Sequence, residues 1–169
     1  MKIKNIFLLA GSIFISQLAG IIGAFATVSS VSTWYLTLEK PSFNPPSWVF
    51  GPVWTILYTM MGIAFFLILL KKFEKKTKKK KKNKYKNLDY SIKLFLVHLV
   101  FNTTWSLTFF GAKNIGLAFV VIMVLWAMIA CLIKNFYKIN KWASYLLVPY
   151  LLWVSFASIL NLSIFILNI

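Results

Sequence analysis

The chain has 169 residues, of which 60% are hydrophobic, 18% are aromatic and only 13% are charged. An average soluble domain is about 25% charged and about 45–50% apolar, so this composition excludes an ordinary soluble fold. Lysine supplies all 19 basic residues, and 3 acidic residues leave a net charge of +16. The single cysteine, Cys131, excludes a disulfide framework and a cysteine metal cluster.

Five apolar stretches are long enough to cross a bilayer. A hydrocarbon core about 30 Å thick needs about 20 helical residues, and each stretch is too long for a barrel strand of about ten residues. We therefore predict an all-α, polytopic membrane protein: a five-transmembrane-helix bundle that forms one domain over residues 1–169. The predicted spans are residues 5–27, 48–70, 91–110, 115–133 and 142–167.

The first predicted span has two interpretations. Two lysines precede it and the sequence Ala24-Phe25-Ala26 resembles a cleavage site, so it could be a secretory signal. The stretch is longer than a usual signal core, however, and small residues recur along it at i+4 spacing, which suits close helix packing in a membrane. We favour a retained helix whose ridge packs inside the bundle or against a second copy. The ridge consists of Ser12, Ser16, Gly20 and Ala24.

The lysines predict the orientation of the chain. With five spans, 17 of the 19 lysines lie on one side, 11 of them between Lys71 and Lys86, and only Lys40 and Lys113 lie on the other. The positive-inside rule then places the amino terminus inside and the carboxyl terminus outside. We expect the lysine-rich cytoplasmic loop, residues 71–90, to be disordered and to touch anionic lipid. Nucleic acid is not an expected partner, because arginine and interleaved aromatic residues are missing.

Seven tryptophans are many for this length. Three fit an interfacial belt at the membrane faces: Trp34, Trp48 and Trp142. Four others fall deeper in their spans: Trp54, Trp105, Trp126 and Trp153. An indole N–H at that depth must find a partner inside the protein or on a ligand, so these four are candidates for a pocket, with structural packing as the alternative.

Between the first two spans lies an aromatic, proline-rich loop, residues 34–48, on the predicted outer side. Its three prolines prevent a regular helix and restrict the backbone, which predicts a stiff lid; a merely well-ordered connection is the alternative. Ser47 is expected to cap the second helix, and Pro52 to lie in its first turn, where no amide donor is needed.

Polar groups line one face of the third span. His98, Asn102, Trp105 and Phe109 follow one another at helical spacing, and polar residues at membrane depth point toward partners or a cavity. His98 could ligate haem, but no second histidine exists, and a hydrogen-bonded interior imidazole is the more common role.

In the fifth span Pro149 frees the carbonyl of Tyr145 and predicts a kink. Trp153, Ala157 and Asn161 follow at i+4 steps, so this face alternates bulky, small and amide groups as a ligand wall would.

Three blocks of the sequence resemble one known family. The first joins Trp34-Tyr35 and Lys40-Pro41 to Pro45-Pro46, Pro52-Val53-Trp54-Thr55 and Tyr58; the second is Phe101-Asn102, Trp105-Ser106 and Phe109-Phe110-Gly111; the third is Pro149-Tyr150, Trp153, Phe156-Ala157 and Leu160-Asn161. Over nearly the whole chain this pattern resembles the TspO/MBR family, the tryptophan-rich sensory proteins whose animal members are called translocator protein or peripheral benzodiazepine receptor.

The resemblance implies a membrane protein, commonly a homodimer, that binds tetrapyrroles such as protoporphyrin IX and haem beneath the first loop, with no obligatory cofactor and no metal site of its own. It also implies that the matching tryptophans, Trp54 and Trp153, take part if the bound porphyrin is degraded in light. Carried over position by position, the implied ligand-binding residues are Tyr35, Pro46, Trp54, Tyr58, Asn102, Trp105, Trp153 and Ala157.

Two departures from the animal members bear on sterol binding. Val121 stands where they carry a carboxylate, and Leu160-Asn161 is not followed by their tyrosine and arginine. Sterol binding in the animal mode is therefore not expected.

The expected function is a receptor or carrier for porphyrins, since a flat macrocycle suits aromatic walls. The first alternative is an enzyme that degrades porphyrin in light, and the second is a small-molecule transporter. Acid–base or metal catalysis has no support, because all three carboxylates lie outside the spans and one histidine builds no triad. Lysine use without arginine points to an AT-rich bacterial genome, and so to a bacterial cytoplasmic membrane.

Overall fold

The computed structural model describes residues 3–77 and 87–169. Within these residues the fold is helical and contains no strand. The elements in chain order are α1 (Ile3–Val31), α2 (Trp34–Thr37), the 3-10 turn η1 (Ser47–Val49), α3 (Phe50–Thr77), α4 (Leu88–Ser106), the π-helical turn η3 (Leu107–Gly111), α5 (Ile115–Ile139), α6 (Lys141–Tyr145) and α7 (Val148–Leu167).

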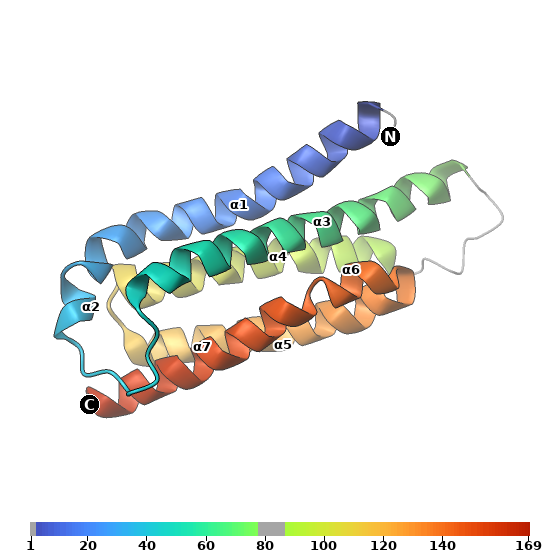
Figure 1. Ribbon diagram of the computed structural model, residues 1–169. Coiled ribbons are helices and arrows are strands. Elements are labelled where there is room, and N and C mark those ends of the chain that lie inside the picture. Colours follow the sequence, from blue (N-terminus) through green and yellow to red (C-terminus); the bar gives the residue numbers. More distant parts are fainter. Residues whose placement is uncertain (1–2, 78–86) are drawn as a thin grey trace.

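The prediction of five membrane spans is confirmed. Five helical segments are long and apolar enough to cross a bilayer: Ile3–Val31, Ser47–Phe73, Leu88–Gly111, Ile115–Ile139 and Lys141–Leu167. They run up and down in turn, so the two termini lie at opposite ends of the bundle (Figure 1). Each segment extends beyond its predicted bounds, because the helices continue past the apolar stretch into polar residues that reach the membrane surface.

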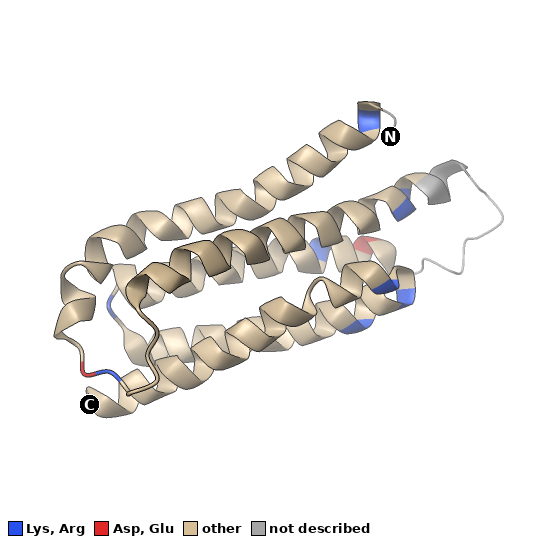
Figure 2. Ribbon diagram, in the orientation of Figure 1, with Lys and Arg blue, Asp and Glu red and all other residues tan. Residues whose placement is uncertain are grey.

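Charged residues gather at the two ends of the bundle and leave the middle uncharged (Figure 2). At the end that holds the amino terminus, Lys72 pairs with Asp89 at 3.0 Å, and both side chains are exposed. A pair in that setting contributes at most about 1 kcal/mol. The lysines at 78–86, where most of the predicted lipid-touching loop lies, fall outside the described residues.

The half of the bundle nearest the amino terminus is filled by aromatic side chains. Phe65 of α3 stacks on Phe95 of α4 with ring centroids 4.3 Å apart, and Phe136 of α5 lies 6.2 Å beyond Phe95. Phe95 and Phe136 are fully buried. This packing fills the interior of one half of the bundle, and a cavity lined by four of the spans lies toward the other half.

The small-residue ridge of α1 packs inside the bundle. Ser12 and Ser16 are buried, while a side chain at Gly20 would collide with the Tyr58 ring of α3. The two helices come close together at Gly62 of α3, where an added Cβ would lie 2.5 Å from the Ile13 Cα. Because small residues on both helices allow this approach, α1 lies along α3 for much of its length.

The structure corrects two details of the predicted helices. The fifth span is broken into α6 and α7 rather than kinked, and Pro149 occupies the first turn of α7, where it needs no amide partner. Ser47 makes no capping bond; it begins η1, which leads directly into α3. Pro52 lies in the first turn of α3 as predicted.

Gly62→Ala should destabilise the protein by about 1–3 kcal/mol, because the added methyl group must push α1 away from α3. Gly11→Ala is the matched control, since a Cβ at Gly11 meets nothing within 4 Å. Thermal unfolding in detergent would show a lower midpoint for Gly62→Ala alone. Equal midpoints for the two variants would contradict close α1–α3 contact.

Candidate functional site

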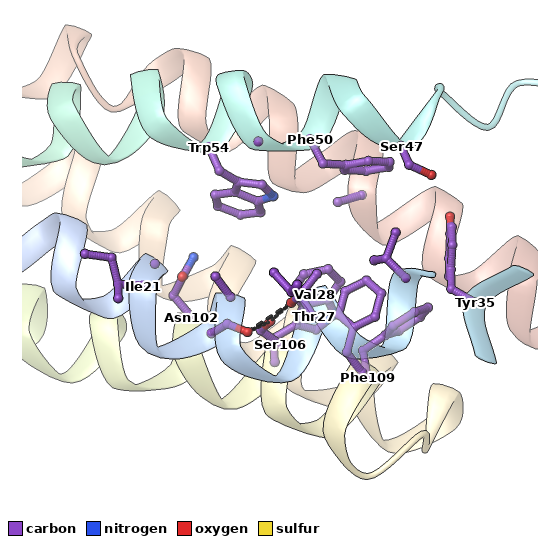
Figure 3. Close-up of a pocket in the computed structure, with 18 of the residues that line it drawn as sticks. Ile21, Thr27, Val28, Tyr35, Ser47, Phe50, Trp54, Asn102, Ser106 and Phe109 are labelled. Atoms are coloured by element: carbon purple, nitrogen blue, oxygen red, sulfur yellow. Dashed lines mark hydrogen bonds between the residues drawn. The ribbon is translucent and has the colours of Figure 1, made fainter. Parts of the chain in front are cut away.

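A cavity of 530 Å³ lies beneath α2, between α1, α3, α4 and α7 (Figure 3). Pockets for small molecules commonly measure about 300–1,000 Å³, so this volume suits a ligand rather than a few waters. Its lining is mostly apolar, and Trp54 and Phe50 project into it from α3 (Figure 3).

Aromatic rings form two sides of the cavity. Trp54 stacks on Tyr58 with centroids 5.5 Å apart, and its indole lies 6.4 Å from that of Trp105 at an interplanar angle of 34°. Phe109 extends the Trp105 side at 5.7 Å. Such rings present flat, polarisable faces to a ligand.

The Trp105 indole is held in place by a side chain of α7. Its Nε1 donates to Asn161 Oδ1 at 3.1 Å, and Asn161 Nδ2 donates to the Ile115 carbonyl at 3.0 Å. The deep indole thus finds its partner within the protein, and the amide joins α4, α5 and α7 beside the cavity.

A buried polar cluster closes the inner end of the cavity. The Tyr58 hydroxyl donates to Asn102 Oδ1 in a short hydrogen bond, and Asn102 Nδ2 donates to the Tyr150 hydroxyl at 2.9 Å. All three side chains are nearly inaccessible. They come from α3, α4 and α7, so one amide joins three helices where the filled half of the bundle ends.

Helix α1 supplies a cavity wall that the sequence analysis did not assign. Ile21, Ala24 and Val28 line the cavity, and Thr27 is bonded to Ser106 of α4 at 2.8 Å between hydroxyl oxygens. The small residue at i+4 beyond Gly20, Ala24, was the sequence feature that could have indicated this wall. A row of small residues is equally typical of a helix face that packs against another helix and of one that lines a cavity, so the sequence alone did not assign it.

The first loop covers the cavity and is fastened at both sides. Tyr35 of α2 is buried among Phe109 and Phe110, and its hydroxyl donates to Asn44 Oδ1 at 2.7 Å. Burial raises the pKa of Tyr35, and the Asn44 hydrogen bond offsets part of that rise. Lys40 Nζ lies 5.2 Å from the Tyr35 ring centroid.

Asn168, at the end of α7, ties the far side of this loop. Its Oδ1 accepts from the Glu39 amide at 3.0 Å, and its Nδ2 donates to the Glu39 carbonyl at 2.9 Å. Contacts with Asn168 at the end of α7 and with η3 therefore hold the loop, as a lid over the cavity requires.

The cavity brings together most of the predicted binding residues. Six of them line it: Tyr35, Trp54, Tyr58, Asn102, Trp105 and Ala157. Pro46 and Trp153 do not, and Ser47 and Phe50 are the neighbouring residues that do. Ligand binding by the eight predicted residues stays a prediction.

Trp153 lies behind Phe50. Its ring centroid is 6.0 Å from that of Phe50 and 5.5 Å from that of Phe156, and its buried Nε1 has no hydrogen-bond partner among the described residues. Phe50 therefore stands between this indole and the cavity in the structure.

Two other polar candidates lie away from the cavity. Trp126 bonds through Nε1 to Ser155 Oγ at 2.8 Å on the outer side of α5 and α7. His98 is buried deeper than Asn102 and its Nδ1 is bonded to the Phe95 carbonyl. Within residues 3–77 and 87–169 no three His, Cys, Asp or Glu side chains gather as a metal site.

The sequence pattern of the TspO/MBR family matches residues 12–167. The chain belongs to this family. It is 42% identical over 165 residues to the tryptophan-rich protein TspO of Chlorobaculum tepidum, covering 98% of both chains. It is 38% identical to the TspO of Archaeoglobus fulgidus, covering 97% of this chain and 99% of that one. The translocator protein of Bos taurus is 31% identical, over 89% of this chain and 84% of its own.

Family membership confirms the resemblance drawn from the sequence. With five apolar spans, it establishes a multi-pass membrane protein and supports a receptor or transporter role in the membrane.

Asn168→Ala should loosen the lid, because the Glu39 amide and carbonyl lose their partners. Each of the two hydrogen bonds stabilises the closed loop by about 1 kcal/mol. Losing one or both should therefore accelerate amide exchange at Glu39 about 5- to 30-fold. Hydrogen exchange read by mass spectrometry would measure it. Asn135→Ala is the control, since among the described residues the Asn135 side chain bonds to the Cys131 carbonyl within α5 and to no part of the loop. Unchanged exchange in the loop of Asn168→Ala would show that the lid is held elsewhere.

Proposed function

We propose that this TspO/MBR protein is a membrane receptor or carrier that binds tetrapyrroles, protoporphyrin IX or haem, in the cavity beneath the first loop. The observation that carries the proposal is the aromatic lining: Trp54, Tyr58 and Trp105 face one apolar space of 530 Å³. A planar macrocycle gains contact with such rings along its whole face.

Polar groups at the cavity margins suit the rest of such a ligand. Asn102 stands at the inner end, and hydroxyl groups of Ser32 and Ser47 stand near the lid. A tetrapyrrole with its carboxylates toward the lid would keep these charged groups near the membrane surface, where Lys40 lies, and its apolar ring at depth.

The charge distribution supports an orientation with the amino terminus inside and the carboxyl terminus outside. Glu39, Lys40 and Lys113 are the charged residues at the lid end of the described bundle, while the other end carries most of the described lysines. In this orientation the lid faces outward and the lysine-rich loop faces anionic lipid on the cytoplasmic side. The proposed membrane is a bacterial cytoplasmic membrane, because the chain uses lysine without arginine. The family resemblance supports a homodimer. Ser12 and Ser16 are buried within one copy, so they do not contribute to the contact surface between two copies.

Light-dependent degradation of the bound porphyrin is the second candidate function. Trp54 and Trp105 both line the cavity and place two oxidisable indoles beside a ligand, whereas Trp153 is screened by Phe50. Transport is the third, and the described cavity lining offers no acidic side chain for proton coupling.

Protoporphyrin IX should quench tryptophan fluorescence of the purified protein in detergent, because two indoles line the cavity. Trp54→Leu should weaken binding about 2- to 10-fold, since it removes an aromatic face worth about 0.5–1.5 kcal/mol. Trp126→Leu is the control, because Trp126 lies outside the cavity. Equal affinities for both variants and the wild type would contradict binding at this site.

Illumination of the saturated complex should leave the porphyrin spectrum stable if the protein only binds its ligand. Loss of the spectrum faster than in a heat-denatured sample would instead assign turnover. If turnover occurs, Trp54→Phe should slow it more than Trp153→Phe, because only Trp54 lines the cavity.

A further inference from the structure

His98 is fully buried in α4 and carries one unused nitrogen. Its ring lies against Phe95 and Tyr150, with centroids 4.8 and 5.8 Å away. Its Nδ1 is bonded to the Phe95 carbonyl. A carbonyl oxygen can only accept, so Nδ1 carries the proton.

The imidazole is neutral in this setting. The rings packed against it, Phe95 and Tyr150, carry no charge, and a buried imidazolium without a carboxylate would be an uncompensated charge. Asp89, the acidic residue of the same helix, lies more than two turns away and pairs with Lys72. Nε2 therefore holds a lone pair, and no donor reaches it within the described residues.

Tyr150 carries the complementary unused group. Its hydroxyl oxygen already accepts from Asn102 Nδ2 at 2.9 Å, so its own proton points elsewhere. The part of the chain that the structure describes gives that proton no acceptor. A fully buried donor and a fully buried acceptor thus lie on packed rings of α7 and α4, with centroids 5.8 Å apart at an angle of 64° and no direct bond between them among the described residues.

We propose that one buried water molecule occupies this place, accepting from the Tyr150 hydroxyl and donating to His98 Nε2. Leaving both groups unpaired would carry the full desolvation cost of each, which a bridging water removes. The hydrogen bonds then run in one direction from Tyr58 through Asn102, Tyr150 and the water to His98.

This water gives His98 a positioning role for the cavity. The Asn102 amide has two orientations, and in the reversed one Tyr150 would donate to Asn102 and no longer to the water. In that orientation the Tyr58 hydroxyl would also lose its acceptor among the described residues. With Oδ1 toward Tyr58 and Nδ2 toward Tyr150, every hydroxyl proton of the row has an acceptor, and the water held by His98 Nε2 supplies the acceptor for Tyr150. The polar groups that Asn102 and Tyr58 present to a ligand are thereby fixed from behind the cavity.

The test uses the ligand-free protein in lipid bilayers, so it does not depend on porphyrin binding. His98 is the only histidine of the chain, and ¹⁵N-histidine labelling therefore reports this ring alone. We expect a neutral Nδ1–H tautomer, an Nε2 resonance shifted as for a hydrogen-bond acceptor, and magnetisation transfer from water to the ring. An Nε2 resonance of a free lone pair, or an acceptor shift without transfer from water, would overturn the proposal.

Tyr150→Phe should move the Nε2 resonance toward its free value and abolish the transfer from water. Tyr137→Phe is the matched control, because Tyr137 is exposed and packs only near Tyr145 and Lys141. Equal spectra for Tyr150→Phe and the control would contradict the bridge.

The positioning role is tested on Asn102. His98→Phe should shift the ¹⁵Nδ2 resonance of Asn102, and His98→Gln, whose amide oxygen can accept from the water, should restore it. In thermal unfolding, the His98→Phe and Tyr150→Phe double variant should lose less than the sum of the two single losses, since both remove the same water. Additive losses and an unmoved Asn102 resonance would show that His98 only fills space.

Discussion

Every polar group inside an apolar bundle must find its partner within the protein, and the side chain of Asn102 meets this constraint for three helices at once. Its two hydrogen bonds, to Tyr58 and Tyr150, join α3, α4 and α7 at one level of the bundle. Because lipid offers no hydrogen-bonding partner at this depth, breaking either bond would leave a buried group without its partner. The cavity begins at this level, so its inner end is fixed by bonds that the membrane makes costly to break.

The two halves of the bundle differ in how their aromatic residues are used. In the half nearest the amino terminus Phe65, Phe95 and Phe136 stack on one another and fill the space. In the half beneath the lid Trp54 stacks on Tyr58, and Trp105, 6.4 Å from Trp54, is held by its bond to Asn161. These rings line the space and do not fill it, which leaves a cavity that a flat ligand can enter.

The lid depends on contacts between residues far apart in sequence. Asn168 after α7 binds Glu39 in the first loop, while Tyr35 packs on Phe109 and Phe110 of η3. Prolines restrict the loop, but these contacts decide where it rests. Because the bonds between Asn168 and Glu39 join exposed groups, this side of the lid is where the enclosure opens at least cost.

Length, apolar runs and helical spacing determined much of this protein from the sequence alone. Five spans follow from hydrocarbon thickness, and the positions of Trp54, Asn102, Trp105 and Ala157 on inward faces follow from helical periodicity, since both are local properties of the chain. Tertiary structure alone decided the wall from α1, the screening of Trp153 by Phe50 and the break before α7. All three features depend on how the helices approach and rotate against each other. A residue such as Gly62 sets that distance through contacts between two helices, and such contacts cannot be read from the sequence of either helix alone.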